Sequence, residues 1–280
     1  MNTDEKEVAE WSDIWQFYSE QLDGRRVWIY RGISDPTYRL KTSLERSAEE
    51  FAVDLADFPA IEKNLMRWFK RRAHHFVPNV PADDDPLEWL ALMQDHGAPT
   101  RLLDWSFSFL VALYFAIEKA KAGCAVWCLD LHWLLYKVEA KFKDQFKTVH
   151  KDDPYLKKRP FFDAVFRGSP PLNLVYSVNP NRLNPRRTIQ QGIFLAAGNL
   201  SRSFEQNFEA IQEDERRRVS KLIIHCNVNT KREILGHLHR MNINRATLFP
   251  GLDGFSQSLK TMLAMPEILK GRAPFSSDKV

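Results

Sequence analysis

The stretch that most constrains this chain covers residues 94–116, QDHGAPTRLLDWSFSFLVALYFA. Its first part is rich in polar side chains and turn-forming residues, and its second part is almost entirely apolar. From Leu102 to Ile117 apolar residues recur at spacings of three, four and seven, which predicts a buried helix. Because a loop anchored on such a helix can place side chains accurately, we expect binding or catalytic residues in this stretch.

The length and composition are those of a globular protein. The chain has 280 residues, of which 44% are hydrophobic, enough for a sizeable core. No apolar run reaches the roughly 18 residues that a membrane-spanning helix needs. The acidic start lacks the features of a secretion signal, so we expect a cytoplasmic protein with no membrane partner. A net charge of +4 is only mildly basic, so any anionic partner must be bound locally.

The pattern of apolar residues predicts an α+β domain in which helices flank a compact mixed sheet. Strands are expected at residues 26–30, 124–131, 173–178, 188–197, 221–228 and 247–249. Helices are expected at residues 4–22, 47–77 (with a break near Pro59), 87–95, 203–220, 231–241 and 252–265. Residues 132–172 mix aromatic and basic side chains and could form helices, an insertion or a lid over the site. The chain lacks the phosphate-binding glycine motifs of Rossmann and P-loop folds.

His96, Arg101 and Asp104 form the densest group of candidate catalytic side chains. His96 could act as a general acid or base, because the unperturbed pKa of histidine is about 6.5. Arg101 could bind a phosphate, and Asp104 could pair with Arg101 or orient His96. In the alternative interpretation, Asp104 caps a helix that begins near Ser106, and Arg101 simply binds Asp104.

A metal site is not expected. Cys124, Cys128 and His132 could point the same way, but the segment CAVWCLDL is more simply a buried strand in which cysteine acts as a small apolar residue.

Several motifs together resemble the FRG-domain family, which is named for a Phe-Arg-Gly motif. The chain has Tyr30-Arg31-Gly32, followed by QDHGAPTRLLDWS at residues 94–106 and VALYFA at residues 111–116. The later segments QQGIF (residues 190–194) and FPGLDG (residues 249–254) also match family patterns. The resemblance implies a single FRG domain over residues 1–280, with a core at about 25–264 and a helical insertion at 47–95.

The order of motifs is also similar to that of ADP-ribosyltransferases. In that superfamily an early Arg or His, a Ser-containing strand that leads into a helix, and a late Gln/Glu-x-Glu element surround NAD. Here the corresponding residues are Arg31, Ser106 and Gln191, but Gly192 replaces the catalytic glutamate. The similarity implies an ADP-ribosyltransferase-like core with a helical N-terminal part.

The implied function is that of an NAD-using ADP-ribosyltransferase or NAD glycohydrolase, such as a toxin or phage-defence effector, with a protein or nucleic-acid acceptor. The expected catalytic residues are Arg31, His96, Arg101, Asp104 and Gln191. The expected cofactor-binding residues are Tyr30, Arg31, Gly32, Thr100, Ser106 and Gln190. The alternative is a non-catalytic module that binds a nucleotide or nucleic acid through Arg31, Arg101 and the basic, aromatic stretch at residues 137–167. It predicts an open basic groove to which Arg67, Arg71, Lys143 and Lys147 contribute. A purely structural scaffold is the third alternative.

Overall fold

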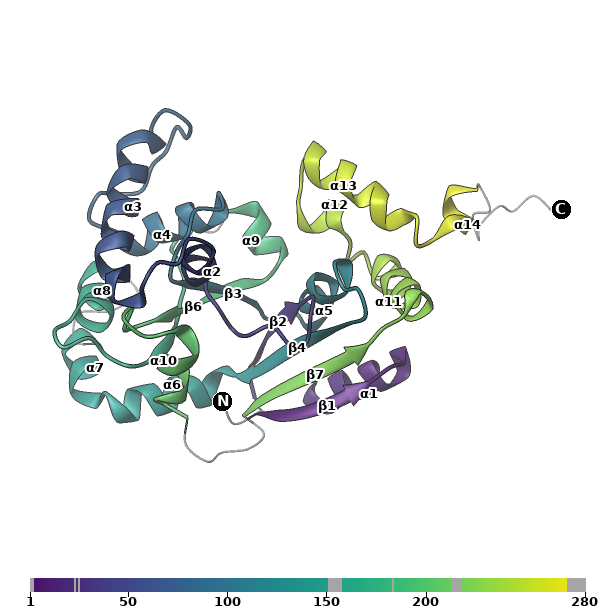
Figure 1. Cartoon of the computed structure of the whole chain (residues 1–280), viewed down its shortest axis with the longest axis horizontal. Coiled ribbons are helices and arrows are strands. Elements are labelled where there is room, and N and C mark those ends of the chain that lie inside the picture. The colour runs from purple at the N-terminus through teal and green to yellow at the C-terminus, as the bar shows by residue number, and fades with distance from the viewer. Residues whose placement is uncertain are drawn as a thin grey trace.

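A seven-stranded sheet is the centre of the computed structural model, which describes residues 3–22, 24, 26–150, 158–182, 184–212 and 218–270 (Figure 1). The strand order is β1-β7-β4-β2-β3-β6-β5. The strands are β1 (Asp4–Val8), β2 (Trp28–Ile33), β3 (Leu102–Ser106), β4 (Gly123–Asp130), β5 (Val175–Val178), β6 (Gly192–Ala197) and β7 (Val219–His225). β1 and β7 are parallel and the other neighbours are antiparallel, so the predicted mixed sheet is confirmed.

Helices cover both faces of the sheet, because alternate residues of its inner strands are apolar on each side. In β4, Cys124, Val126 and Cys128 face the helices α1 (Trp11–Leu22), α5 (Phe109–Glu118) and α11 (Val228–Arg240). The residues between them, such as Ala125 and Trp127, belong to the cluster on the other face. The helices that contribute to that cluster include α3 (Phe58–Ala73), α4 (Pro86–Asp95), α6 (Leu131–Lys141), α7 (Lys143–His150), α8 (Lys158–Phe166) and α10 (Phe204–Glu209).

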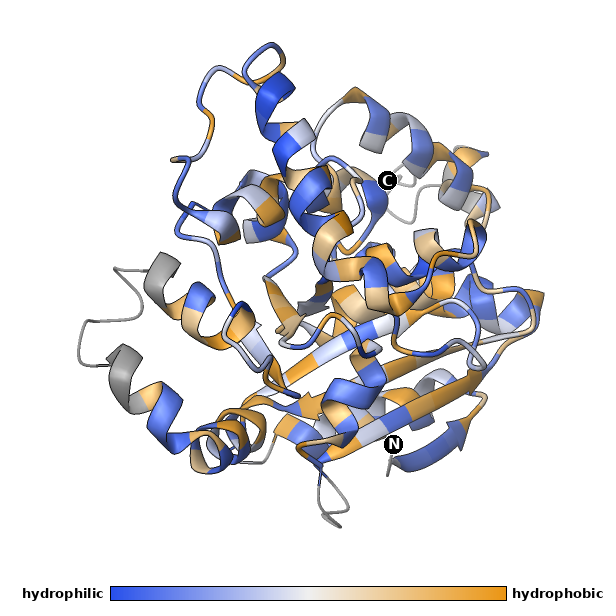
Figure 2. Cartoon of the chain, turned by 60° about the vertical axis from the view of Figure 1, so that its left-hand side comes forward, coloured by the Kyte–Doolittle hydropathy of each residue, from blue (hydrophilic) through white to orange (hydrophobic). Residues whose placement is uncertain are grey.

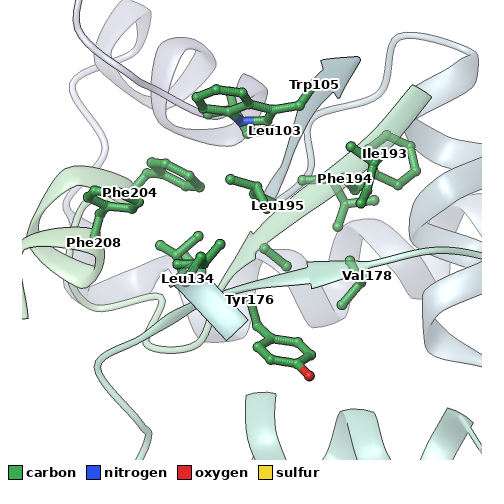
Figure 3. Packing of buried hydrophobic residues seen from close by; sticks show 14 of the residues in the cluster. Leu103, Trp105, Leu134, Tyr176, Val178, Ile193, Phe194, Leu195, Phe204 and Phe208 are labelled. Carbon is green, nitrogen blue, oxygen red and sulfur yellow. The ribbon is translucent and has the colours of Figure 1, made fainter. Parts of the chain in front are cut away.

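Apolar side chains of the surrounding helices pack closely against the end of the sheet formed by β3, β6 and β5. Phe204 and Phe208 of α10 and Leu134 of α6 lie against Leu195 of β6 in the same cluster (Figure 3). Apolar residues concentrate on the strands and on the helix faces next to them, and polar residues lie on the outer turns (Figure 2). The remaining helices are α2 (Ser43–Glu50), the 3₁₀ turn Leu55–Asp57, α9 (Pro185–Ile189), α12 (Arg245–Leu248), α13 (Leu252–Met262) and α14 (Pro266–Leu269).

The prediction of one helix from Leu102 to Ile117 was wrong at its start. Residues 102–106 form β3, which pairs with β6, and α5 begins only at Phe109. The Ser108 hydroxyl accepts a hydrogen bond from the Val111 backbone N–H and caps this helix. Two buried leucines next to a buried tryptophan suit either structure, and pairing with β6 decides in favour of the strand.

Three further boundaries differ from the predictions. Residues 4–8 form the edge strand β1 and not a helix, because β7 supplies hydrogen-bond partners to the charged segment DEKEV. β2 extends to Ile33, so Arg31 and Gly32 lie inside the strand and not beyond its end. Residues 247–249 are not a strand, because α12 runs through Leu248 with Asn244 as its cap.

The late strand and the late charged helix are both shorter than predicted. Residues 188–191 belong to α9 and a turn, and β6 begins at Gly192. The expected helix at 203–220 is limited to α10; residues 213–217 lie outside the described residues, and β7 begins at Val219.

Residues 132–172 contribute helices α6, α7 and α8 in their described part, and residues 151–157 lie outside it. Phe146, Phe162 and Phe166 from this segment are buried in the core. Across the described residues, no helix combines the length and apolar character that crossing a bilayer requires.

Candidate functional site

The candidate site lies at a break in the middle of the sheet. β2 pairs with β4 over its whole length, but it pairs with β3 only through Tyr30 and Ser106. Beyond that pair the two strands are not hydrogen-bonded, and a cavity of about 280 Å³ is lined by residues of both. In an intact sheet, backbone hydrogen bonds between β2 and β3 would fill this space. Because the strands are unpaired here, side chains line the space instead.

The walls of this cavity come from segments far apart in the sequence. β2 provides Arg31 and Gly32, and β3 provides residues 104–106. The other walls comprise Gln94 and Asp95 of α4, Ala112 and Phe115 of α5, Arg186 and Arg187 of α9, Gln190, and residues 192–194 of β6. The predicted meeting of an early arginine and a middle serine is therefore seen, whereas the late glutamine in the cavity wall is Gln190 and not Gln191.

Arg31 is the cation that the central strand β2 contributes to the cavity. Its Nη1 donates a hydrogen bond to the Asp104 carbonyl oxygen at 2.5 Å, and its buried Nε has no hydrogen-bond partner. Within the described residues Arg31 forms no ion pair. Burial lowers the pKa of Arg31 to about 10, against the opposing effect of Asp104, so the guanidinium stays charged at neutral pH. A cation with unused N–H donors beside a cavity is suited to an anionic ligand.

The Asp104 carboxylate is exposed at the cavity, and a chain of side-chain hydrogen bonds orients it. Its Oδ2 accepts a hydrogen bond from Gln94 Nε2 at 2.7 Å, and Gln94 Oε1 accepts one from the Thr100 hydroxyl at 2.6 Å. Thr100 is fully buried and does not line the cavity, so it contributes by orienting Gln94. The alternative in which Asp104 caps a helix and binds Arg101 was wrong, because Ser108 is the cap and Arg101 pairs with Glu62.

Ser106 ties β3 to the turn before β6. Its hydroxyl donates to the Gln190 carbonyl at 2.7 Å and accepts from the Ser108 N–H at 2.9 Å, which leaves one lone pair. The Gln190 side chain donates to the Leu248 carbonyl at 2.9 Å. Gln191 is exposed, with φ of +48°, and does not line the cavity. The backbone is left-handed at Gln191 in this turn, and the glutamine that lines the cavity is Gln190.

Gly192 occupies the position where the superfamily comparison expects a glutamate, and the local packing leaves little room for one. A Cβ atom on Gly192 would lie 2.8 Å from Cγ of Arg187. Arg187 is buried over the Phe194 ring and donates to Asp95 Oδ1 at 2.6 Å. Burial raises the pKa of Asp95, although Arg187 opposes the shift. The carboxylates at this cavity therefore come from Asp95 and Asp104.

Tyr30 and Gly32 support Arg31 through packing. Tyr30 is buried against Phe109 of α5, with ring centroids 5.4 Å apart, and burial raises the pKa of its hydroxyl. A Cβ atom on Gly32 would lie 1.9 Å from the Ala112 carbonyl oxygen. The glycine is therefore required for the close approach of α5 to β2, which positions the arginine before it.

Residues 26–124 match the family model of the FRG domain. The chain carries an FRG domain. The match includes Arg31, Gln94, Asp104 and Ser106, whereas α9 and β6 complete the cavity from beyond the matched residues. No curated protein and no solved structure matches the chain, so the likeness of its core to ADP-ribosyltransferases stays a prediction.

Two polar residues of the FRG domain's central motif lie away from the cavity. Arg101 is buried, and its Nε and Nη2 bind the two carboxylate oxygens of the equally buried Glu62. Its Nη1 donates to the carbonyls of Phe166 and Ala197. His96 is the exposed C-cap of α4 and lines a separate apolar hollow with Trp68 and Phe76. The structure thus brings neither His96 nor Arg101 to Arg31.

The predicted basic groove and the cysteines contribute no residue to the described cavity wall. Arg67, Arg71 and Lys143 are exposed, and the side chain of Lys147 lies outside the described residues. Cys124 and Cys128 are buried in β4, and burial raises the pKa of each thiol to about 12. Among the side chains that the structure describes, no three His, Cys, Asp or Glu residues are grouped as metal ligands.

Asp95, Arg186 and Arg187 line the cavity but were not predicted as site residues from the sequence. The segment NPRR at residues 184–187 has a detectable signal, an Asn cap followed by proline at the first turn of a helix. That signal predicts α9 but not its contact with α4, which depends on the Arg187–Asp95 ion pair.

Proposed function

We propose that the cavity beside Arg31 is a nucleotide-binding site and that its ligand is NAD or a closely related dinucleotide. The observation that carries this proposal is the state of Arg31: a charged guanidinium at a cavity, fixed by one carbonyl, with an unpartnered Nε and no ion pair in the described residues. A pyrophosphate would supply the missing charge and hydrogen-bond acceptors. Arg186, which is exposed at the same cavity, adds a second cation.

The size of the cavity limits how such a ligand would be bound. Small-molecule pockets are typically about 300–1,000 Å³, and this cavity of about 280 Å³ is slightly smaller than that range. It would hold one part of a dinucleotide, and the rest would extend outside. Phe115 and Trp105 provide apolar surface for a base or a nicotinamide ring, and the Asp104 carboxylate is a suitable acceptor for ribose hydroxyls.

The two carboxylates favour a second candidate, an enzyme of the ADP-ribosyltransferase or NAD glycohydrolase type. When the bond between ribose and nicotinamide breaks, positive charge develops on the ribose, and a fixed carboxylate stabilises it. Asp104, oriented by Gln94, would supply that charge where Gly192 has no side chain. The acceptor would be water, a protein or a nucleic acid. Loss of cellular NAD through such a reaction would suit a toxin or a phage-defence effector.

Direct measurement of NAD binding and of nicotinamide release tests both candidates. We expect Arg31→Gln to weaken NAD binding by roughly 10- to 100-fold, because it removes charge-assisted hydrogen bonds of about 1.5–3 kcal/mol. Arg186→Gln should weaken binding less, because its side chain is exposed. Arg182→Gln is the matched control: it is an exposed arginine just before α9 that does not line the cavity.

The outcomes separate binding from catalysis. Nicotinamide release by the wild type that is lost in Asp104→Asn, while NAD is still bound, would support the enzyme. Binding without release, even with cell extract as acceptor, would support a non-catalytic module. Equal NAD affinity in wild type and Arg31→Gln would refute the proposed site.

A further inference from the structure

A second cleft of about 470 Å³ lies where α5, α11 and α13 meet, on the side of the molecule that carries the C-terminal helices (Figure 1). It is larger than the Arg31 cavity and shares no lining residue with it. Neither the FRG resemblance nor the proposed NAD site accounts for its residues, most of which lie beyond the matched residues 26–124.

The charges of this cleft are strongly unequal. Glu118 is the one carboxylate among its described lining residues, and Arg245 Nη1 lies 2.9 Å from both of its oxygens. The Tyr114 hydroxyl also donates to Glu118, at 3.0 Å. With Glu118 neutralised in this way, four further cations set the potential of the cleft: Lys119, Lys231, Arg232 and Lys260.

Helix capping explains only part of this group. Lys231 Nζ donates to the Ala120 carbonyl at 2.7 Å, and Arg232 Nε donates to the Ala264 carbonyl at 3.1 Å, both just past helix ends. These partners carry no net charge, and each cation keeps further N–H donors. Lys119 and Lys260 are exposed and form no hydrogen bond or ion pair within the described residues. Arg245 adds a buried Nε without a partner.

The wall between the cations is apolar. Val228, Leu235 and Ala264 line the cleft, and Val228 is 73% exposed. A cleft with several cations around an apolar wall matches a ligand that combines an anionic group with an apolar body. We propose that it is a second ligand site, and that its ligand is a small organic phosphate whose phosphate group is bound by Lys119, Lys260 and the cations of α11.

Titration of the full-length protein with 1-naphthyl phosphate and with inorganic phosphate, at low ionic strength, tests this proposal. The Lys119→Gln/Lys260→Gln variant should bind naphthyl phosphate roughly tenfold more weakly than the wild type. Neither lysine has a structural partner in the described residues, so this variant should keep its fold. Val228→Ser should weaken binding of naphthyl phosphate and leave that of inorganic phosphate unchanged, because it removes only apolar contact.

Two controls decide where the ligand binds. Lys63→Gln/Arg202→Gln removes two exposed cations elsewhere and should leave the affinity unchanged. Arg31→Gln should retain the binding of naphthyl phosphate that depends on Lys119 and Lys260. An equal loss in the Lys63/Arg202 variant would mean nonspecific attraction and would overturn the proposal. So would loss of binding in Arg31→Gln, which would assign the ligand to the other cavity, or absence of binding by the wild type.

Discussion

Arg31 and Arg101 lie in the two most distinctive motifs of the chain, and their surroundings differ in what balances the charge. Arg101 shares a buried two-point contact with the Glu62 carboxylate, and carbonyl oxygens accept from its remaining nitrogen. Arg31 has one carbonyl partner, an unpartnered Nε and a cavity beside it. A saturated arginine holds the fold together, whereas an unsaturated one is available to a ligand. The partners of a cation, and not the density of polar residues in a motif, therefore indicate function.

The same substitution at the two arginines should therefore change stability by very different amounts. Arg101→Met leaves the Glu62 carboxylate buried without its partner, and we expect it to lower the free energy of unfolding by about 3–5 kcal/mol. Urea denaturation followed by circular dichroism would measure this loss. The double variant Arg101→Met/Glu62→Leu should recover most of it. A loss below about 1 kcal/mol in the single variant would show that the pair is not the structural element described here.

Gly32→Ala should give the next largest effect. The added Cβ meets the Ala112 carbonyl, which belongs to the backbone of α5 and cannot rotate away, so we expect a destabilisation of about 1–3 kcal/mol or more. Gly236→Ala is the matched control, because a Cβ on Gly236 of α11 meets nothing within 4 Å. That variant should be neutral or slightly stabilising in the same thermal unfolding experiment. Equal behaviour of the two variants would contradict close packing of α5 on β2.

Arg31→Met should change stability least among the arginine variants. Replacing a partly buried, incompletely paired cation by an apolar side chain of similar length is often neutral or stabilising, so we expect a change within about 1 kcal/mol. The same variant should lose NAD binding. If it instead unfolded as readily as Arg101→Met, Arg31 would be a structural residue like Arg101, and the proposed difference between the two arginines would be wrong.

Long, strongly patterned segments made much of this fold predictable from the sequence. The buried run of β4 and the helix α4 were expected close to their observed positions. β1 was missed because four of its five residues are charged, and only its pairing with β7 makes it a strand. The residues of β3 were assigned to a helix because Leu102, Leu103 and Trp105 fit both periodicities.

The candidate site was predictable only where local sequence determines position. Arg31 and Ser106 line the cavity as expected. The strand signal at residues 26–30 places Arg31, whereas Ser106 was expected there from the motif although its strand β3 was assigned to a helix. Gln190, expected to bind the cofactor, lines the cavity, whereas Gln191, expected to be catalytic, does not. The left-handed turn at Gln191 could not be inferred from its side chain. Asp95, Arg186 and Arg187 reach the cavity through tertiary contacts between α4 and α9, which leave no periodic signal in the sequence.

A third arginine, Arg187, is intermediate between Arg31 and Arg101. The smallest predicted effect on stability concerns the carboxylate with which it pairs. Its partner Asp95 lines the cavity, and burial raises the pKa of that carboxyl above its ordinary value. In the pH range between the ordinary and the raised pKa, the folded protein therefore holds a proton that the unfolded chain has released. The contribution of Asp95 to stability is present at lower pH and is lost as the pH rises through its folded pKa.

Urea denaturation of wild type and Asp95→Asn from pH 4 to about pH 7 would test this sign, because the variant has no carboxyl to titrate at position 95. The free energy of unfolding of the wild type, minus that of the variant, should fall as the pH rises. If the difference increased with pH, attraction to Arg187 would outweigh the cost of burial. The Arg187–Asp95 pair would then resemble Arg101 and Glu62, a closed structural contact, and Arg31 would be the only one of the three arginines in the described structure with charge available to a ligand.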